Sequence, residues 1–191
     1  PSVSASQRYW HLSAHPQSSQ YADASTATRP DFAGHFAHAA LEPVKAYVPR
    51  SSLHDQIHAQ LARDAADSGT RTLVVWGLGG AGKTQLVLDY VRQHRGEYKA
   101  TFWIEAGRKE SLERDFVRLY QTLFGLHTSA GAETAISVED AVTGVKSWFA
   151  GQRGPWLMVF DGADTIADEE TDGYIDIKHF IPNAVSLDVI V

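Results

Sequence analysis

The chain lacks cysteine altogether, which excludes disulfide bonds, thiolate metal sites and a thiol nucleophile. It has no apolar stretch near the roughly 18 residues that a membrane-spanning helix needs, and no secretory signal is visible. Its formal net charge is −6 and its basic residues are scattered, which disfavours sequence-independent nucleic-acid binding. These absences favour a soluble, cytoplasmic protein without a membrane span or a nucleic-acid partner.

Methionine is also scarce, because Met158 is the only one and Pro1 stands first. We therefore expect the chain to be a piece of a longer protein. Residues 1–43 are rich in Ser, Ala, His and Gln and lack apolar periodicity, which predicts a disordered or weakly structured linker. Within it, residues 34–40 are compatible with a short helical turn. One folded domain is expected over residues 44–191.

One octet of the chain matches the phosphate-binding pattern G-x-x-x-x-G-K-[ST]. It consists of Gly77, Leu78, Gly79, Gly80, Ala81, Gly82, Lys83 and Thr84. In such a loop the backbone N–H groups form an anion site, and the following helix adds the positive end of its dipole. We expect Gly77 and Gly82 to adopt conformations or approaches that a Cβ would forbid. Lys83 is expected to reach the β- and γ-phosphates and Thr84 to ligate Mg²⁺.

Strand and helix patterns alternate along the folded part of the chain. Helices are expected from a cap at Ser51 or Ser52 onward and over 82–95, 112–123 and 138–149, and strands over 71–76, 101–104, 156–160 and 187–191. This order predicts an α/β fold with a mostly parallel sheet and helices on both faces. Because Trp103, Trp148 and Trp156 each lie within an apolar element, we expect them in the core.

Two carboxylates follow the apolar run 156–160. Asp161 comes directly after it, at the carboxyl end of a buried strand, where ligand sites of open α/β sheets lie. This placement favours a role in supporting Mg²⁺, although a polar strand end or a helix cap is the alternative. Asp164 has two interpretations of equal weight: it directs or deprotonates the attacking water, or it caps a following helix.

These motifs together resemble STAND P-loop NTPases, the NB-ARC and NACHT domains of NOD-like receptors, and most closely the fungal forms. The resemblance covers residues 44–191 and extends from 77–84 through Gln85 and Leu86. The block 47–50 is similar to the family segment that approaches adenine, which implies nucleotide contacts for Val48, Pro49 and Arg50; for Arg50 a solvated charge is the alternative. Residues 101–106 and 157–164 resemble the second-strand and Walker B blocks.

The resemblance implies a P-loop NTPase three-layer sandwich that is truncated after its fourth core strand. It implies that residues 187–191 insert between the strand before the loop and the strand before Asp161. The family's sensor arginine, fifth strand, helical domain and winged-helix domain would follow beyond Val191. A chain without them is expected to bind nucleotide weakly, to hydrolyse it poorly and to carry an unpaired sheet edge.

The leading functional prediction is a nucleotide switch that binds ATP or ADP with Mg²⁺. The resemblance implies slow hydrolysis by Lys83, Asp161 and Asp164, and control of homo-oligomerisation in a full-length innate immune receptor. One alternative is an ADP-locked scaffold without turnover. Another is a small-molecule phosphotransferase, although the segment 125–135 lacks the Arg and Lys residues of a lid.

The histidines offer weaker candidates. His54 and His58 are one helical turn apart, but no third ligand is placed by the sequence. We therefore expect both on the solvent face of their helix rather than in a metal site. A metal site is likewise not expected at His35 and His38 in the N-terminal segment.

Overall fold

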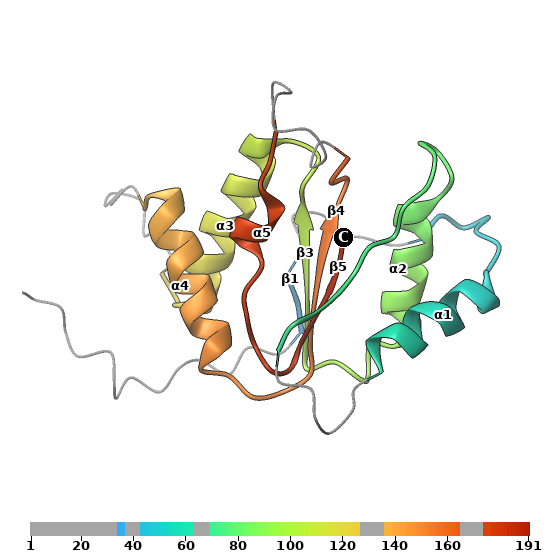
Figure 1. Cartoon of the computed structure of the whole chain (residues 1–191), viewed down its shortest axis with the longest axis horizontal. Coiled ribbons are helices and arrows are strands. Elements are labelled where there is room, and N and C mark those ends of the chain that lie inside the picture. The colour runs from blue at the N-terminus through green and yellow to red at the C-terminus, as the bar shows by residue number, and fades with distance from the viewer. Residues whose placement is uncertain (1–33, 37–42, 63–68, 127–135, 165–173) are drawn as a thin grey trace, which may run out of the picture.

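The computed structural model describes residues 34–36, 43–62, 69–126, 136–164 and 174–191. A parallel sheet lies at its centre, with five strands in the order β1-β3-β4-β5-β2 (Figure 1). The strands are β1 (Gly34–Phe36), β2 (Arg71–Leu73), β3 (Ala100–Glu105), β4 (Trp156–Asp161) and β5 (Leu187–Ile190). The expected α/β class with a parallel sheet is confirmed.

Helices cover both faces of the sheet. The helices α1 and α2 lie on one face, and α3, α4 and α5 lie on the other (Figure 1). Their bounds are α1 (Ser51–Leu61), α2 (Lys83–Gln93), α3 (Lys109–Leu123), α4 (Val138–Ala150) and α5 (Ile177–Phe180). Two hydrophobic cores result, one between each helical layer and the sheet.

Strand β4 shows how one apolar run serves both cores. Met158 and Phe160 belong to the core under α3, α4 and α5, whereas Leu157 and Val159 belong to the core under α1 and α2. Successive side chains of a strand point to opposite faces, so an uninterrupted apolar run suits a strand that is covered twice. All five residues from 156 to 160 are buried, as the sequence predicted.

Aromatic rings dominate the larger core. Phe102 on β3 lies 5.2 Å from Phe149 and 6.4 Å from Trp148, measured between ring centroids. Trp156 lies 6.2 Å from the same ring. These edge-to-face and tilted contacts are the favourable geometries for aromatic pairs. Trp103 is buried in the opposite core, so the expectation that all three tryptophans are core residues is confirmed.

The start of α1 differs from the prediction. Arg50 occupies the N-cap position and Ser51 is already helical, so neither Ser51 nor Ser52 is the cap. The Arg50 carbonyl accepts hydrogen bonds from the N–H groups of Leu53 and His54 at 2.9 and 3.1 Å. The helix therefore begins one residue earlier than the serine preference for N-caps suggested.

The N-terminal segment contributes one element that the sequence did not predict. Residues 34–36 form β1, which pairs with residues 100–102 of β3, so the expected helical turn over 34–40 is wrong at these positions. An edge strand carries unpaired backbone groups, and β1 satisfies those of β3 without needing an apolar pattern of its own. The rest of the predicted linker, 1–33 and 37–42, lies outside the described residues, as does most of the loop expected over 125–134.

The predicted position of the last strand is confirmed. β5 lies between β4 and β2 and pairs with both in parallel. Beyond β5 the pairing continues, because the Val75 N–H donates to the Val191 carbonyl at 2.8 Å. Within the described part of the chain β2 pairs only with β5, so the expected open edge lies at the strand that leads into the glycine-rich segment 77–82.

The contact between α3 and α4 gives a testable prediction about stability. A Cβ added at Gly144 would lie 2.2 Å from Cε2 of Tyr120 on the facing helix. Alanine normally stabilises a helix interior by about 0.5–1 kcal/mol relative to glycine. Here we expect Gly144→Ala to lower the free energy of unfolding, because the half-buried ring must move. In a Tyr120→Ala background the same substitution should raise the free energy of unfolding. Denaturant unfolding of wild type, both single variants and the double variant measures these changes. Stabilisation by Gly144→Ala in both backgrounds would contradict the close approach of the Tyr120 ring to Gly144.

Candidate functional site

The octet 77–84 lies between β2 and α2 at the carboxyl edge of the sheet, and its last two residues are the first two of α2 (Figure 1). Gly80 and Gly82 have φ values of 76° and 83°, and Gly82 is the left-handed N-cap of α2. For Gly82 the expected need for glycine is confirmed. For Gly77 φ is not positive and the nearest atom to an added Cβ, on Ala81, is 4.0 Å away, so only a close approach to a bound phosphate would require glycine there, and that stays a prediction. Gly80 takes that conformational role instead.

Lys83 begins α2 and folds back over the loop. Its ammonium donates a hydrogen bond to the Gly77 carbonyl at 2.9 Å and lies 3.7 Å from Oδ1 of Asp164. The side chain is 27% exposed, so the charge stays at the mouth of the loop rather than extending into solvent. The first-turn N–H groups of α2 have no acceptor within their own helix, and they add positive potential at the same point.

Thr84 and Asp161 meet although 77 positions separate them in sequence. The Thr84 hydroxyl donates to Oδ1 of Asp161 at 2.8 Å. The contact follows from the strand order, because only β5 lies between the strands that lead to these residues and all the strands run parallel. A hydroxyl and a carboxylate oxygen at this distance offer the hard oxygen donors that Mg²⁺ prefers.

Asp164 completes the charged side of the site. Its side chain is 77% exposed at the rim, and its N–H donates to the Gly162 carbonyl at 2.7 Å. The cavity between the loop and the end of β4 measures about 230 Å³. Its polar lining residues are Lys83, Thr84, Asp161 and Asp164. A helix capped by Asp164 would lie outside the described residues, so the capping alternative stays a prediction.

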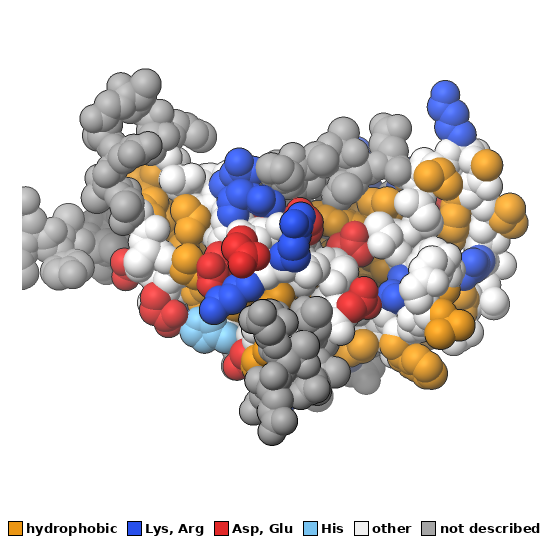
Figure 2. All heavy atoms as spheres, turned by 90° about the horizontal axis from the view of Figure 1, so that it is seen from above, with side chains coloured by type: hydrophobic (Ala, Val, Ile, Leu, Met, Phe, Trp, Pro, Cys, Tyr) orange, Lys and Arg blue, Asp and Glu red, His pale blue; other side chains and the backbone are white. Residues whose placement is uncertain are grey.

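Figure 2 looks onto the carboxyl ends of the strands. Acidic and basic side chains gather over α3, α5 and the adjoining part of the sheet, and apolar side chains gather toward the end formed by α1 and α2. The exposed apolar residues around the loop include Trp76 at 89% and Leu78 at 85% exposure. The site thus has a charged centre beside an apolar surface.

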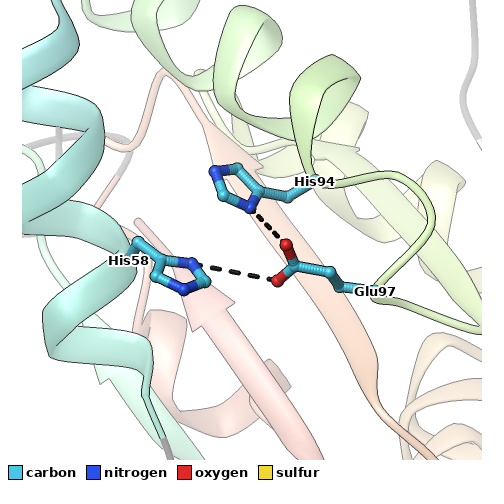
Figure 3. Close-up of side chains that lie close together, drawn as sticks. All are labelled: His58, His94 and Glu97. Atoms are coloured by element: carbon cyan, nitrogen blue, oxygen red, sulfur yellow. Dashed lines mark hydrogen bonds and ion pairs between the residues drawn. The ribbon is translucent and has the colours of Figure 1, made fainter.

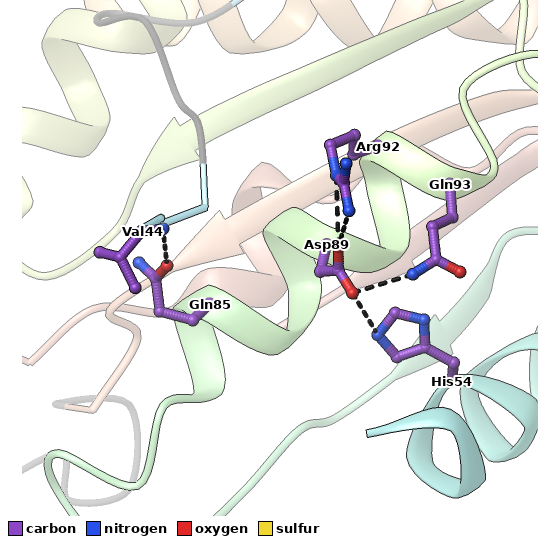
Figure 4. A network of polar contacts seen from close by, with 6 residues as sticks. All are labelled: Val44, His54, Gln85, Asp89, Arg92 and Gln93. Carbon is purple, nitrogen blue, oxygen red and sulfur yellow. Dashed lines mark hydrogen bonds and ion pairs between the residues drawn. The ribbon is translucent and has the colours of Figure 1, made fainter. Parts of the chain in front are cut away.

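The segment 44–50 lies against the loop. The side-chain oxygen of Gln85 accepts a hydrogen bond from the Val44 N–H at 2.7 Å (Figure 4). Arg50 extends to the loop, with Nη2 3.7 Å from the position of a Cβ on Gly82. Arg50 also lines a second cavity, of about 420 Å³, together with Ala81 and Lys83. Val48, Pro49 and Arg50 are all exposed, but of the three only Arg50 lines this cavity.

A buried polar network joins α1 to α2 and was not expected from the sequence. Asp89 is fully buried and accepts hydrogen bonds from Arg92 at 2.6 Å and Gln93 at 2.9 Å (Figure 4). His54 lies 3.4 Å from the same carboxylate and is 5% exposed, so the expected solvent-facing position of His54 is wrong. Burial raises the pKa of the nearby Tyr47 hydroxyl, and the charge of Asp89 adds to this rise.

Sequence signals existed for some of these contacts. His54 lies on the same helical stripe as Ile57 and Leu61, which are both buried, so its spacing pointed inward. Gln85 gave no comparable signal, because its partner lies 41 residues earlier. No local sequence pattern predicts a contact between residues so far apart. The hydrogen bond between Val44 and Gln85 anchors the segment that carries Arg50 to the first turn of α2.

Comparisons of the chain with protein-family models, with curated proteins and with solved structures found no match. Among the described residues, no helix is both long and apolar enough to cross a membrane.

Proposed function

We propose that the chain is the nucleotide-binding part of a STAND-type signalling switch of the NB-ARC/NACHT class. In this proposal it binds ATP or ADP with Mg²⁺, and the bound nucleotide controls homo-oligomerisation of a cytoplasmic, NOD-like receptor. The observation that carries the proposal is the 2.8 Å contact between Thr84 and Asp161 beside the ammonium of Lys83. It supports a site in which a glycine-rich loop, a cation and a strand-end carboxylate act on one phosphate chain.

The residues are suited to separate parts of the nucleotide. The backbone of 77–82 and the first turn of α2 supply N–H donors for phosphate oxygens. Lys83 would exchange its contact with the Gly77 carbonyl for a phosphate oxygen, which is a stronger, charge-assisted partner. Arg50 is placed on the other side of the loop, where the second cavity can accept the nucleoside. The choice of adenine rests on the resemblance of 47–50 to the family segment.

The Mg²⁺ position is suited to Thr84 and Asp161. Both donors are oxygens, and Mg²⁺ is commonly held by one or two carboxylates together with phosphate oxygens. When bound, Mg²⁺ neutralises charge that develops on the phosphates. Asp161 holds the Thr84 hydroxyl in place from the end of β4, and β5 fixes the distance between their strands.

Asp164 is the candidate for directing the attacking water. Its exposed carboxylate lies at the cavity rim and 3.7 Å from Lys83, so it can accept a proton or orient a water near the phosphate end of the site. Turnover by the switch is proposed to be slow. Native mass spectrometry and single-turnover phosphate release separate a switch from an ADP-locked scaffold: tight co-purified ADP without any release would favour the scaffold.

The contact between Thr84 and Asp161 is tested by its effect on the magnesium dependence of ATP binding. We expect Mg²⁺ to strengthen ATP binding by the chain, and Thr84→Ala and Asp161→Asn each to reduce that gain about tenfold, in line with the loss of one charge-assisted contact. Titration with labelled ATP in magnesium or in EDTA measures the gain. Thr143→Ala, at an exposed position of α4, is the matched control and should change nothing.

Two outcomes would contradict the proposal. One is the absence of saturable ATP binding by folded chain in the presence of magnesium. The other is saturable binding whose magnesium dependence survives both Thr84→Ala and Asp161→Asn. The second outcome would place the nucleotide elsewhere on the surface.

A further inference from the structure

Three potential metal ligands come together at the ends of α1 and α2 that lie away from the phosphate loop. His58 is on the last turn of α1, His94 directly follows α2, and Glu97 lies in the turn after it (Figure 3). One ligand atom from each residue lies within 4.8 Å of the other two. The carboxylate of Glu97 points between the two rings, with one oxygen toward each imidazole (Figure 3).

The backbone and the neighbouring rings orient these groups before any ion binds. The Glu97 N–H donates to the His94 carbonyl at 2.9 Å, which fixes the turn that carries both residues. Nδ1 of His94 lies 2.7 Å from Oε1 of Glu97, and Nδ1 of His58 lies 3.8 Å from Oε2. The His94 ring packs on Tyr90 at 4.3 Å and stacks on His58 at 4.7 Å between centroids.

We propose that His58, His94 and Glu97 bind Zn²⁺, with water as the fourth ligand. Two imidazole nitrogens and one carboxylate oxygen are a common set of three protein ligands for Zn²⁺, whereas Mg²⁺ and Ca²⁺ prefer oxygen donors throughout. The side chains of His58 and Glu97 are 50% and 53% exposed, so an ion can enter and a coordinated water can face solvent. Zinc–ligand bonds near 2 Å require the side chains to close on the ion, and half-exposed side chains can do so.

The ion would join two helices that both begin beside the phosphate loop. α1 starts after Arg50 and α2 starts at Lys83, while the proposed ligands lie at the opposite ends of both helices. Zn²⁺ would therefore cross-link the layer that supports the loop without entering the nucleotide site. This inference does not depend on the proposed nucleotide function.

The experiment is a zinc titration of the untagged full chain in competition with a chromogenic chelator. We expect one site, and we expect its dissociation constant to rise at least about tenfold in His58→Ala, His94→Ala and Glu97→Gln. Loss of even an outer-shell partner typically costs about 10- to 100-fold in affinity. His179→Ala is the matched control, because His179 is also partly exposed and lies 3.3 Å from Glu139. It should leave the affinity unchanged.

A second readout identifies the ligands directly. Co²⁺ bound in place of Zn²⁺ should give visible d–d bands of a four-coordinate site, without thiolate bands because the chain has no cysteine. These bands should disappear in His94→Ala, because the site then lacks one of its two imidazole ligands. Circular dichroism of each variant measures whether the fold is retained.

Two results would overturn the site. The first is a folded wild-type chain that shows no stoichiometric Zn²⁺ binding. The second is binding of equal affinity in wild type and all three ligand variants, which would assign it to other histidines of the chain.

Discussion

Replacement of Lys83 by alanine should weaken ATP binding about 10- to 100-fold and leave the free energy of unfolding nearly unchanged. A hydrogen bond to a charged group contributes about 1.5–3 kcal/mol, and each 1.4 kcal/mol is a tenfold change in affinity. In the structure the ammonium contacts only the Gly77 carbonyl and, at 3.7 Å, Asp164, among the described residues. Both partners are accessible to water, so the loss of the lysine leaves no buried group unpaired.

The matched control for Lys83→Ala is Lys109→Ala on α3. Lys109 is 60% exposed and lies 3.9 Å from Glu113, a surface pair of small energetic value. Both variants remove one positive charge, so a general electrostatic effect would weaken ATP binding equally in both. A loss confined to Lys83→Ala would support a specific phosphate contact. Equal affinities for Lys83→Ala and wild type would contradict the proposed site.

The nucleotide prediction and the fold prediction had different origins in the sequence. The strands and their faces followed from apolar runs such as 156–160, because burial on both sides of a parallel sheet requires them. Lys83, Thr84 and Asp161 followed from a motif and from a position after a strand. Their approach in space then required only that β5 lie between β2 and β4, which the structure shows.

The contacts that the sequence did not reveal are of two kinds. Some join residues far apart in the chain through polar groups, such as the Gln85 side chain and the Val44 N–H, for which no periodicity exists. Others depend on which of several compatible conformations a segment adopts. Residues 34–36 have no clear apolar pattern and form a strand because β3 offers unpaired backbone groups. For the loop, the motif predicted glycine positions but not that Gly80 rather than Gly77 takes a positive φ.

Truncation of Phe102 to alanine should lower the free energy of unfolding by about 3–5 kcal/mol, the typical cost of removing a buried phenylalanine ring. Phe102 is fully buried on β3 and lies between rings from α4 and β4, including Phe149 at 5.2 Å. The surrounding rings are held by α4 and the sheet, so they cannot collapse into the space that the missing ring leaves. Denaturant unfolding followed by circular dichroism measures the change.

Phe124→Ala is the matched control, because it removes the same atoms from a residue that is 39% exposed and packs on Tyr120 at 4.6 Å. We expect a loss of no more than about 1 kcal/mol there, since most surface changes are small. A similar loss in both variants would contradict the buried position of Phe102 in the larger core.

Phe102→Ala also serves as a comparison for the effect of Lys83→Ala on ATP binding. Phe102 lies on the side of the sheet that faces α4, so its removal should reduce ATP binding only in proportion to the fraction of chain that unfolds. Lys83→Ala should reduce binding by fully folded chain. Measured together, the two variants separate a site that depends on one ammonium group from a surface that merely requires a folded sheet.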